Sequence, residues 1–355
     1  MASSNIEKLP ATLIAVLLTH FAYRDWIRLT RSCAKFLSLS RVPEASPASV
    51  RVVLPSGTVN YNNRDGLQRL LQRSYFRPRK MDITTYDDVS IPNLDASAAC
   101  VRHLSLRCVR VFPKLILRVF TCLQTLSINH LPPYSYSELA TTLTSIDVDD
   151  RSAGYDQYCM ANLAKRCVLL ASLRIQLHPT TVEYVIGGTH QVPFHSDHVF
   201  SSLVAVNLSC QIWDSIHKIL GYMPALTHAT FRNVNEGLYA LADLRDNIRL
   251  RSRHGWLASS SNITHLTLGS LCINKPAMDE LFRVLRPSCE TLVHMTLDEC
   301  FLRTDDETVA ECCSRFRAFP NLQRLVIARC TISEEGHPFT LPKFASQLPY
   351  SLLIE

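Results

Sequence analysis

Apolar residues recur along most of the chain in one short pattern, in which an apolar residue is followed by others three and five positions later. The pattern starts at nine positions: Val101, Leu123, Leu143, Leu170, Leu203, Leu226, Ile263, Leu292 and Leu322. These starts are 20 to 37 residues apart, which suits one short strand plus a return segment that is usually helical. One such unit cannot bury its apolar face alone. The pattern therefore predicts stacked units that share a continuous core.

The last three units carry a second pair of apolar or thiol positions, eight and ten residues after each start. These pairs are Leu271 and Ile273, Cys300 and Leu302, and Cys330 and Ile332. Helical returns are predicted over 276–285 and 304–319, the second beginning with Thr304 and Glu307 at capping-box spacing. The wide intervals 175–203 and 231–263 predict insertions or a missed unit.

Before the first regular unit, "SVRVVL" and "MDITTY" also have the composition of strands. They lie within residues 50–98, where the repeat pattern itself is not recognisable. We therefore expect an irregular first unit that caps the array.

The position two residues after each start is expected to face away from the core. It reads His103, Thr125, Ser145, Ser172, Ala205, His228, His265, His294 and Arg324. Three histidines thus occupy consecutive units, and because neighbouring strands lie about 4.8 Å apart, their rings are predicted to form a ladder. The position two residues further reads Thr230, Thr267 and Thr296 in the same units.

Three interpretations of this surface stay open. It could be an ordinary solvated sheet face. It could bind a partner protein through His228, His265, His294, Arg324, Thr267 and Thr296, with histidine titration making the binding sensitive to pH. Three imidazoles could also bind zinc, but no fourth ligand is evident. We assign no metal.

The N-terminal stretch "LPATLIAVLLTHF" predicts a short amphipathic helix that begins near Pro10. Its apolar stripe, at helical spacing, consists of Ile14, Leu17, Leu18 and Phe21. Asp25 is a candidate N-cap for a second helix, whose stripe continues through Trp26, Leu29, Cys33 and Phe36. Three short helices in about forty residues make a marginal core, so this unit needs a partner surface.

Composition narrows the class of protein. With 355 residues, 47% hydrophobic and 19% charged, the chain is expected to be globular. No apolar run approaches the roughly 20 residues that span a membrane, and no signal-cleavage site follows Phe21. The 13 cysteines are odd in number and include no C-x-x-C pair. Reduced, mostly buried thiols and a cytoplasmic or nuclear location are therefore expected.

Two basic clusters and a net charge of +6 permit an acidic partner. The clusters are Arg69, Arg73, Arg77, Arg79 and Lys80, and Arg245, Arg249, Arg251 and Arg253. They suit a solvated surface or recognition of an acidic or phosphorylated segment, whereas RNA binding is the less favoured alternative. No local catalytic signature such as G-x-S-x-G or H-E-x-x-H occurs. We predict a non-enzymatic protein without a cofactor.

The segment from Leu9 to Leu39 resembles an F-box and aligns with it without a gap. The family's leading Leu-Pro, its first-helix apolar positions and its later aromatic and leucine positions have counterparts here, and Thr12, Trp26, Ser32 and Phe36 depart from its usual residues. The resemblance implies that a Skp-type adaptor would contact Leu9, Pro10, Leu13, Ile14, Leu17, Leu18, Phe21, Trp26, Leu29, Cys33 and Phe36.

The repeats resemble leucine-rich repeats of the cysteine-containing kind found beside F-boxes. Together the two resemblances imply an α/β fold, with a three-helix F-box followed by a leucine-rich-repeat solenoid that has parallel strands on its concave face and helices on its convex face. The expected parts are an F-box-like domain over 1–41, a linker and irregular capping unit over 42–98, repeats over 99–335 and a C-terminal tail over 336–355.

This architecture implies a substrate-recognition subunit of an SCF-type, cullin–RING ubiquitin ligase. Its expected partners are a Skp-type adaptor, the cullin scaffold and a protein substrate, with no membrane and no nucleic acid. A leucine-rich-repeat scaffold outside any ligase is the alternative, in which the helices only cap the array.

Overall fold

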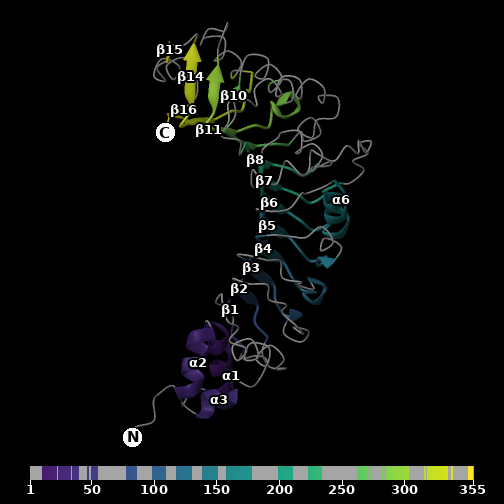
Figure 1. The fold of residues 1–355 in the computed structure, drawn as a ribbon, viewed down its shortest axis with the longest axis vertical. Coiled ribbons are helices and arrows are strands. Elements are labelled where there is room, and N and C mark those ends of the chain that lie inside the picture. The colour runs from purple at the N-terminus through teal and green to yellow at the C-terminus, as the bar shows by residue number, and fades with distance from the viewer. Residues whose placement is uncertain are drawn as a thin grey trace. The chain divides into compact units, whose positions relative to one another are not determined.

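The computed structural model describes the secondary-structure elements and the turns beside them. The described residues are 10–21, 23–32, 34–39, 46–47, 49–54, 77–85, 98–108, 117–129, 138–150, 157–177, 199–210, 223–233, 262–270, 272–273, 282, 285–303, 316, 318–334, 337–338 and 351–354. The chain divides into two compact units, 1–148 and 149–355. Figure 1 labels the helices and strands of both units.

The first unit begins with three short helices. They are α1 (Ala11–Thr19), α2 (Tyr23–Ser32) and α3 (Ala34–Leu39). Ile14, Leu18 and Trp26 form their buried core, against which Ala15, Ile27, Leu29 and Leu39 pack. Asp25 is not the N-cap of α2, because this helix begins two residues earlier and places Asp25 in its first turn, 3.5 Å from Arg28.

Parallel strands in consecutive order make up the rest of the first unit. They are β1 (Ser49–Leu54), β2 (Lys80–Thr85), β3 (His103–Cys108), β4 (Thr125–Ile128) and β5 (Ser145–Asp150), the last at the boundary between units. The strand predictions for "SVRVVL" and "MDITTY" are therefore confirmed as β1 and β2, which pair directly. The described part of the return between β3 and β4 contains the 3-10 helix η3 (Leu117–Val119).

The second unit repeats the same plan. Helix α6 (Gln157–Arg166) leads into β6 (Ser172–Leu177), and β7 (Ala205–Cys210), β8 (His228–Asn233), β9 (His265–Gly269), β11 (His294–Asp298) and β13 (Arg324–Ala328) follow in parallel. All nine predicted strands are thus present at the predicted places. The array ends differently from the prediction of a tail, because β16 (Ser351–Ile354) extends the sheet beside β13.

The predicted apolar positions form the core of both units. The start residue of each of the nine units is buried, as are the residues three and five positions later, down to the smallest, Ala229. Every second strand residue faces the core because side chains alternate in a strand, and the residues between them form the outward face. This arrangement is that of a leucine-rich-repeat-like solenoid.

One backbone contact recurs before β3, β4, β5, β7, β8, β9, β11 and β13 and sets their register. The Thr227 carbonyl accepts hydrogen bonds from the backbone N–H groups of both Thr264 and His265, at 2.9 and 3.0 Å. The Thr264 carbonyl accepts from Val293 and His294 in the same way. Each of these strands is therefore aligned at its first residue, which places equivalent positions of consecutive units side by side.

A second, smaller sheet lies next to the C-terminal strands. It contains β10 (Cys272–Ile273), β12 (Phe301–Arg303), β14 (Thr331–Glu334) and β15 (His337–Pro338). Three of these strands coincide with the second apolar pairs noted in the sequence. The turn into each begins with a residue in the left-handed conformation, namely Ser270, Glu299 and Arg329.

The thiols in these turns bond to the previous strand. Cys300 Sγ donates to the Leu268 carbonyl at 3.5 Å, and Cys330 Sγ donates to the Leu297 carbonyl at 3.3 Å. Each cysteine thereby links one turn to the unit before it. Most residues of the two predicted return helices, 276–285 and 304–319, lie outside the described residues. A 3-10 helix, η8 (Arg286–Ser288), follows the first of these ranges.

Candidate functional site

The three consecutive histidines form the predicted ladder on the outward face of the second unit. His228 pairs in register with His265, and His265 with His294, which in turn pairs with Arg324. The rings of His228 and His265 are stacked, with centroids 4.3 Å apart and planes 10° from parallel. The ring of His294 meets that of His265 edge-on, at 4.5 Å and 83°.

Threonines at the strand starts orient two of these rings. Thr264 Oγ1 lies 2.8 Å from His265 Nδ1 and donates to the Thr227 carbonyl at 3.2 Å. Thr227 Oγ1 makes the equivalent pair of contacts with His228 Nδ1 and the Val204 carbonyl. Each hydroxyl therefore lies between Nδ1 of its ring and a carbonyl of the preceding repeat, which fixes the orientation of the ring.

The central ring of the ladder resists protonation. Burial, followed by the neighbouring His228 and His294, lowers the pKa of His265. A charged imidazolium there would lose hydration and face two further imidazoles. The ladder therefore favours the neutral state at its centre.

A shallow depression of about 260 Å³ lies beside the ladder in the second unit. It is lined by His265, Leu266, Thr267, His294, Thr296, Arg324 and Val326. Thr267 and Thr296 pair in register between the histidine row and the strand ends. The structure thus brings the predicted partner-binding residues to one surface, with His228 at its edge, and this surface offers imidazole acceptors, hydroxyls and one exposed guanidinium.

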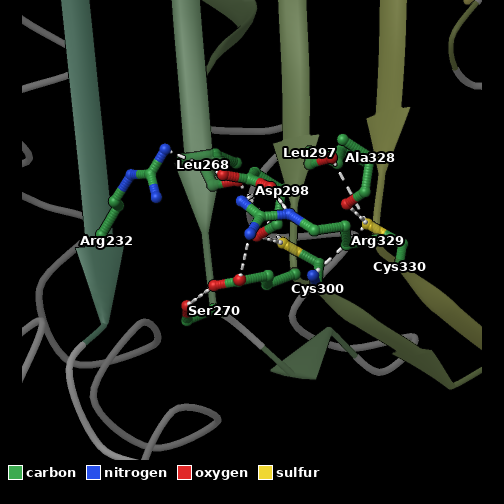
Figure 2. A network of polar contacts seen from close by, with 10 residues as sticks. Arg232, Leu268, Ser270, Leu297, Asp298, Cys300, Ala328, Arg329 and Cys330 are labelled. Carbon is green, nitrogen blue, oxygen red and sulfur yellow. Dashed lines mark hydrogen bonds and ion pairs between the residues drawn. The ribbon is translucent and has the colours of Figure 1, made fainter. Parts of the chain in front are cut away.

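The third outward positions of β8 and β11 hold two members of an ion-pair network that sequence reasoning missed (Figure 2). The carboxylate of Asp298, although on the outward side, is only 7% exposed. Arg232 Nη2 reaches its Oδ2 at 2.8 Å, while Arg329 contacts its Oδ1 through Nη2 at 2.7 Å and Nε at 3.1 Å. Two guanidinium groups compensate the desolvated charge, so Asp298 ties β8 to β11 and to the turn after β13.

Gly269 makes the longer of these links possible. Arg232 pairs in register with Gly269, and Gly269 with Asp298, so the arginine must cross the glycine strand to reach the carboxylate. A Cβ at residue 269 would lie 2.7 Å from Arg232 Cγ. The signal in the sequence was an Arg, a Gly and an Asp six residues after consecutive unit starts.

The left-handed turns add a second row of polar contacts. Arg329 Nη1 lies 2.6 Å from Glu299 Oε1, and Ser270 Oγ donates to Glu299 Oε2 at 3.2 Å. These three residues occupy the same turn position in consecutive units. These contacts link the turns that follow β9, β11 and β13.

Helix α1 presents a second candidate surface, on the first unit. Its predicted stripe divides into two sets: Ile14 and Leu18 are each 1% exposed, whereas Leu17 is 47% and Phe21 36% exposed. Leu13, outside the predicted stripe, is 52% exposed. Leu13 and Leu17 are four residues apart and follow one side of α1, and Phe21 lies two residues beyond the end of this helix. The buried pair holds the helical core and the exposed row is accessible to a partner.

The remaining residues expected to contact an adaptor are placed as follows. Pro10 is exposed, Trp26 is buried and Leu29 is half-buried. Leu9 and Cys33 lie outside the described residues, as does the side chain of Phe36 in α3. Thr12 and Ser32 are both exposed, and Ser32 Oγ donates to the Leu29 carbonyl at 2.6 Å.

The basic clusters are described only in part. Arg77, Arg79 and Lys80 are exposed at the start of β2, whereas Arg69, Arg73 and the whole cluster from Arg245 to Arg253 lie outside the described residues. The outward face of the sheet adds two further exposed cations, Arg51 and Arg107.

The described thiols form no disulfide, and the described residues form no group that could hold a metal ion. Six cysteines whose side chains are described are free thiols; Cys167 and Cys300 are buried, Cys122 is exposed, and Cys100, Cys289 and Cys330 are half-buried. Burial raises the pKa of Cys167 to about 12, so this thiol stays protonated. Within the described ranges, no group of three or more His, Cys, Asp or Glu residues is arranged to hold a metal ion.

The likeness of this chain to known proteins is confined to solved structures. No protein-family model and no curated protein matches the chain. Among solved structures, it is similar to the crystal structure of the leucine-rich repeat-containing protein LegL7 from Legionella pneumophila. The identity is 12% and the TM-score 0.37, over 84% of this chain and 97% of that one. None of the described helices is long and apolar enough to cross a bilayer.

Two surfaces of the described residues have the composition of protein-binding surfaces. The outward faces of the sheet are rows of side chains repeated at the strand spacing, and the first helix exposes an apolar row. Both features suit protein–protein interaction.

Proposed function

We propose that this protein is the substrate-receptor subunit of an SCF-type ubiquitin ligase, acting in the cytosol or the nucleus. Its N-terminal helices dock a Skp-type adaptor, and the adaptor links it to the cullin scaffold. The repeat sheet holds a protein substrate. Ubiquitin transfer itself is catalysed by other subunits, which act on the substrate because it is held nearby.

The observation that carries the proposal is the exposed apolar row on α1. A short helical unit that needs its leucines for its own stability would bury them, as it does Ile14 and Leu18. Leu13, Leu17 and Phe21 instead stay about half exposed, and burying the remainder would contribute about 1 kcal/mol per side chain. These residues belong to the segment that resembles an F-box.

The repeat sheet supports the second half of the role. Its outward rows present imidazole, hydroxyl and guanidinium groups that a folded or extended protein segment can meet in register. The buried side of every strand is used by the core, so the outward face is the surface left for a substrate.

A pull-down with a purified Skp-type adaptor tests the proposal. We expect the full chain to bind stably and Leu17→Asp to abolish binding, because a carboxylate would be buried in an apolar contact. Leu169→Asp is the matched control, since Leu169 is similarly exposed but lies in the second unit, after α6. This control should bind as the native chain does.

The alternative, a leucine-rich-repeat scaffold outside any ligase, predicts a different result. Folded, monodisperse protein that never binds the adaptor would favour the scaffold and overturn the ligase role. Equal loss of binding in Leu17→Asp and Leu169→Asp would show that the helix does not carry the contact.

A further inference from the structure

A second depression, of about 690 Å³, lies on the outward face of the first unit. It extends over β1 to β4, and the side chains around it include Arg51, Lys80, Asp82, His103, Arg107 and Thr125. All of these strands pair in register within one unit, so the depression is built by the sheet itself. These residues lie between positions 51 and 125, so no local motif in the sequence groups them.

The three cations stand on three neighbouring strands at staggered positions. Arg51 on β1 is in the row of Asp82, Lys80 on β2 is in the row of His103, and Arg107 on β3 is in the row of Thr84. With strands ~4.8 Å apart and ~6.7 Å between alternate residues, their Cα atoms lie roughly 8–14 Å from one another. Cations spread over this distance suit a chain that carries several anions.

The charges of this depression are unbalanced. Asp82 is the one carboxylate among the described residues of the lining, and its Oδ2 lies 3.7 Å from Lys80 Nζ. The described residues provide no ion pair for Arg51 or Arg107, and both are exposed. Three cations against one carboxylate therefore leave two guanidinium groups available for bidentate bonds to carboxylate or phosphate.

Hydrogen-bonding groups line the floor between the cations. His103 Nδ1 lies 2.9 Å from Thr125 Oγ1, and Ser105 and Ser127 pair in the next row. Where the structure describes the lining, it has no Phe, Tyr or Trp on which a nucleobase could stack. The same outward rows turn acidic at β5, with Asp147 next to Ser127, which disfavours a long polyanion that continues along the sheet.

We propose that this depression binds an acidic, extended segment of the substrate protein, through Arg51 and Arg107 to its carboxylate or phosphate groups. The inference rests on the proposed role of the repeat sheet as the substrate-holding surface and names the chemistry that it selects. Glutamate and phosphoserine share this chemistry, and the experiment separates them.

The test measures fluorescence anisotropy of labelled peptides with the full chain. The probes are a ten-residue glutamate peptide and the same peptide with two phosphoserines. The variant Arg51→Glu/Arg107→Glu reverses both unpaired cations. The control Arg102→Glu/Arg118→Glu makes the same change in net charge at exposed arginines of the same unit that are not in the lining.

We expect the native chain to bind at least one probe, the depression variant to lose at least tenfold in affinity and the control to change less than about twofold. The probe with the higher affinity identifies carboxylate or phosphate as the preferred group. No binding of either probe, or equal loss in both variants, would overturn the inference. Adaptor binding by the native chain, measured in parallel, shows whether the ligase role survives independently.

Discussion

The imidazole rings of His228 and His265 stack face to face, 4.3 Å apart, although the two residues are 37 positions apart in the chain. Their register in paired parallel strands places them there. With His294 edge-on at the other side, His265 is enclosed by two rings of its own kind. This relationship makes the surface sensitive to pH in a predictable direction.

We predict that His265 titrates below an ordinary histidine. Burial and its two histidine neighbours lower its pKa, so the unfolded chain takes up this proton first as the pH falls. The stability linked to His265 is therefore complete above the ordinary histidine pKa and is lost as the pH falls from there toward the folded value. Following the ring carbon resonance against pH by NMR measures the shift.

A substitution next to the ring provides the control. His228→Ala removes one neighbour and should raise the pKa of His265, whereas His103→Ala, in the other unit, should leave it unchanged. A His265 that titrates at or above the value of the denatured chain would contradict the prediction.

Replacing His228, His265 and His294 together by Ala should weaken binding of an identified partner without unfolding the array. The rings stand on the outward face, so their removal opens no cavity, and each substitution should change stability by about 0.5 kcal/mol or less. Thermal unfolding followed by circular dichroism, beside a pull-down of the partner, separates the two effects. Unchanged binding would leave this surface as a solvated sheet face.

Asp298→Asn should destabilise the second unit by about 2 kcal/mol, because it leaves Arg232 and Arg329 without their shared carboxylate. The loss stays moderate since these arginines are 42% and 59% exposed and can recover hydration. Glu299→Gln, whose carboxylate is more exposed, should lose less than about 1 kcal/mol. Urea unfolding measures both, and an equal loss would show that burial of Asp298 does not matter.

Gly269→Ala should cost about 1–2 kcal/mol, because its Cβ displaces the Arg232 side chain from Asp298. The double variant Gly269→Ala/Arg232→Ala tests the cause. If the clash is the reason, the double variant should be clearly less destabilised than the sum of the two single variants. Additive losses would instead indicate that residue 269 is sensitive for its backbone alone.

Positions that depend on a repeated local pattern were predictable from sequence. The apolar spacing identified nine strands and separated core from outward residues. Side chains alternate along a strand, and stacked repeats bury the same side of each strand, so the apolar positions had to face the core. The histidine ladder followed directly from that register. The strand at 351–354 was not predicted because the residues that lead into it do not show the apolar spacing of the nine repeats.

What the sequence by itself determined is therefore the row that each outward residue occupies and the apolar character of the first helix. Tertiary structure decided which of α1's apolar residues are buried, since Ile14 and Leu18 pack on Trp26 while Leu17 does not. It also decided that Arg232 reaches Asp298 across Gly269. Such contacts join residues through side-chain length and strand pairing, which no local spacing encodes.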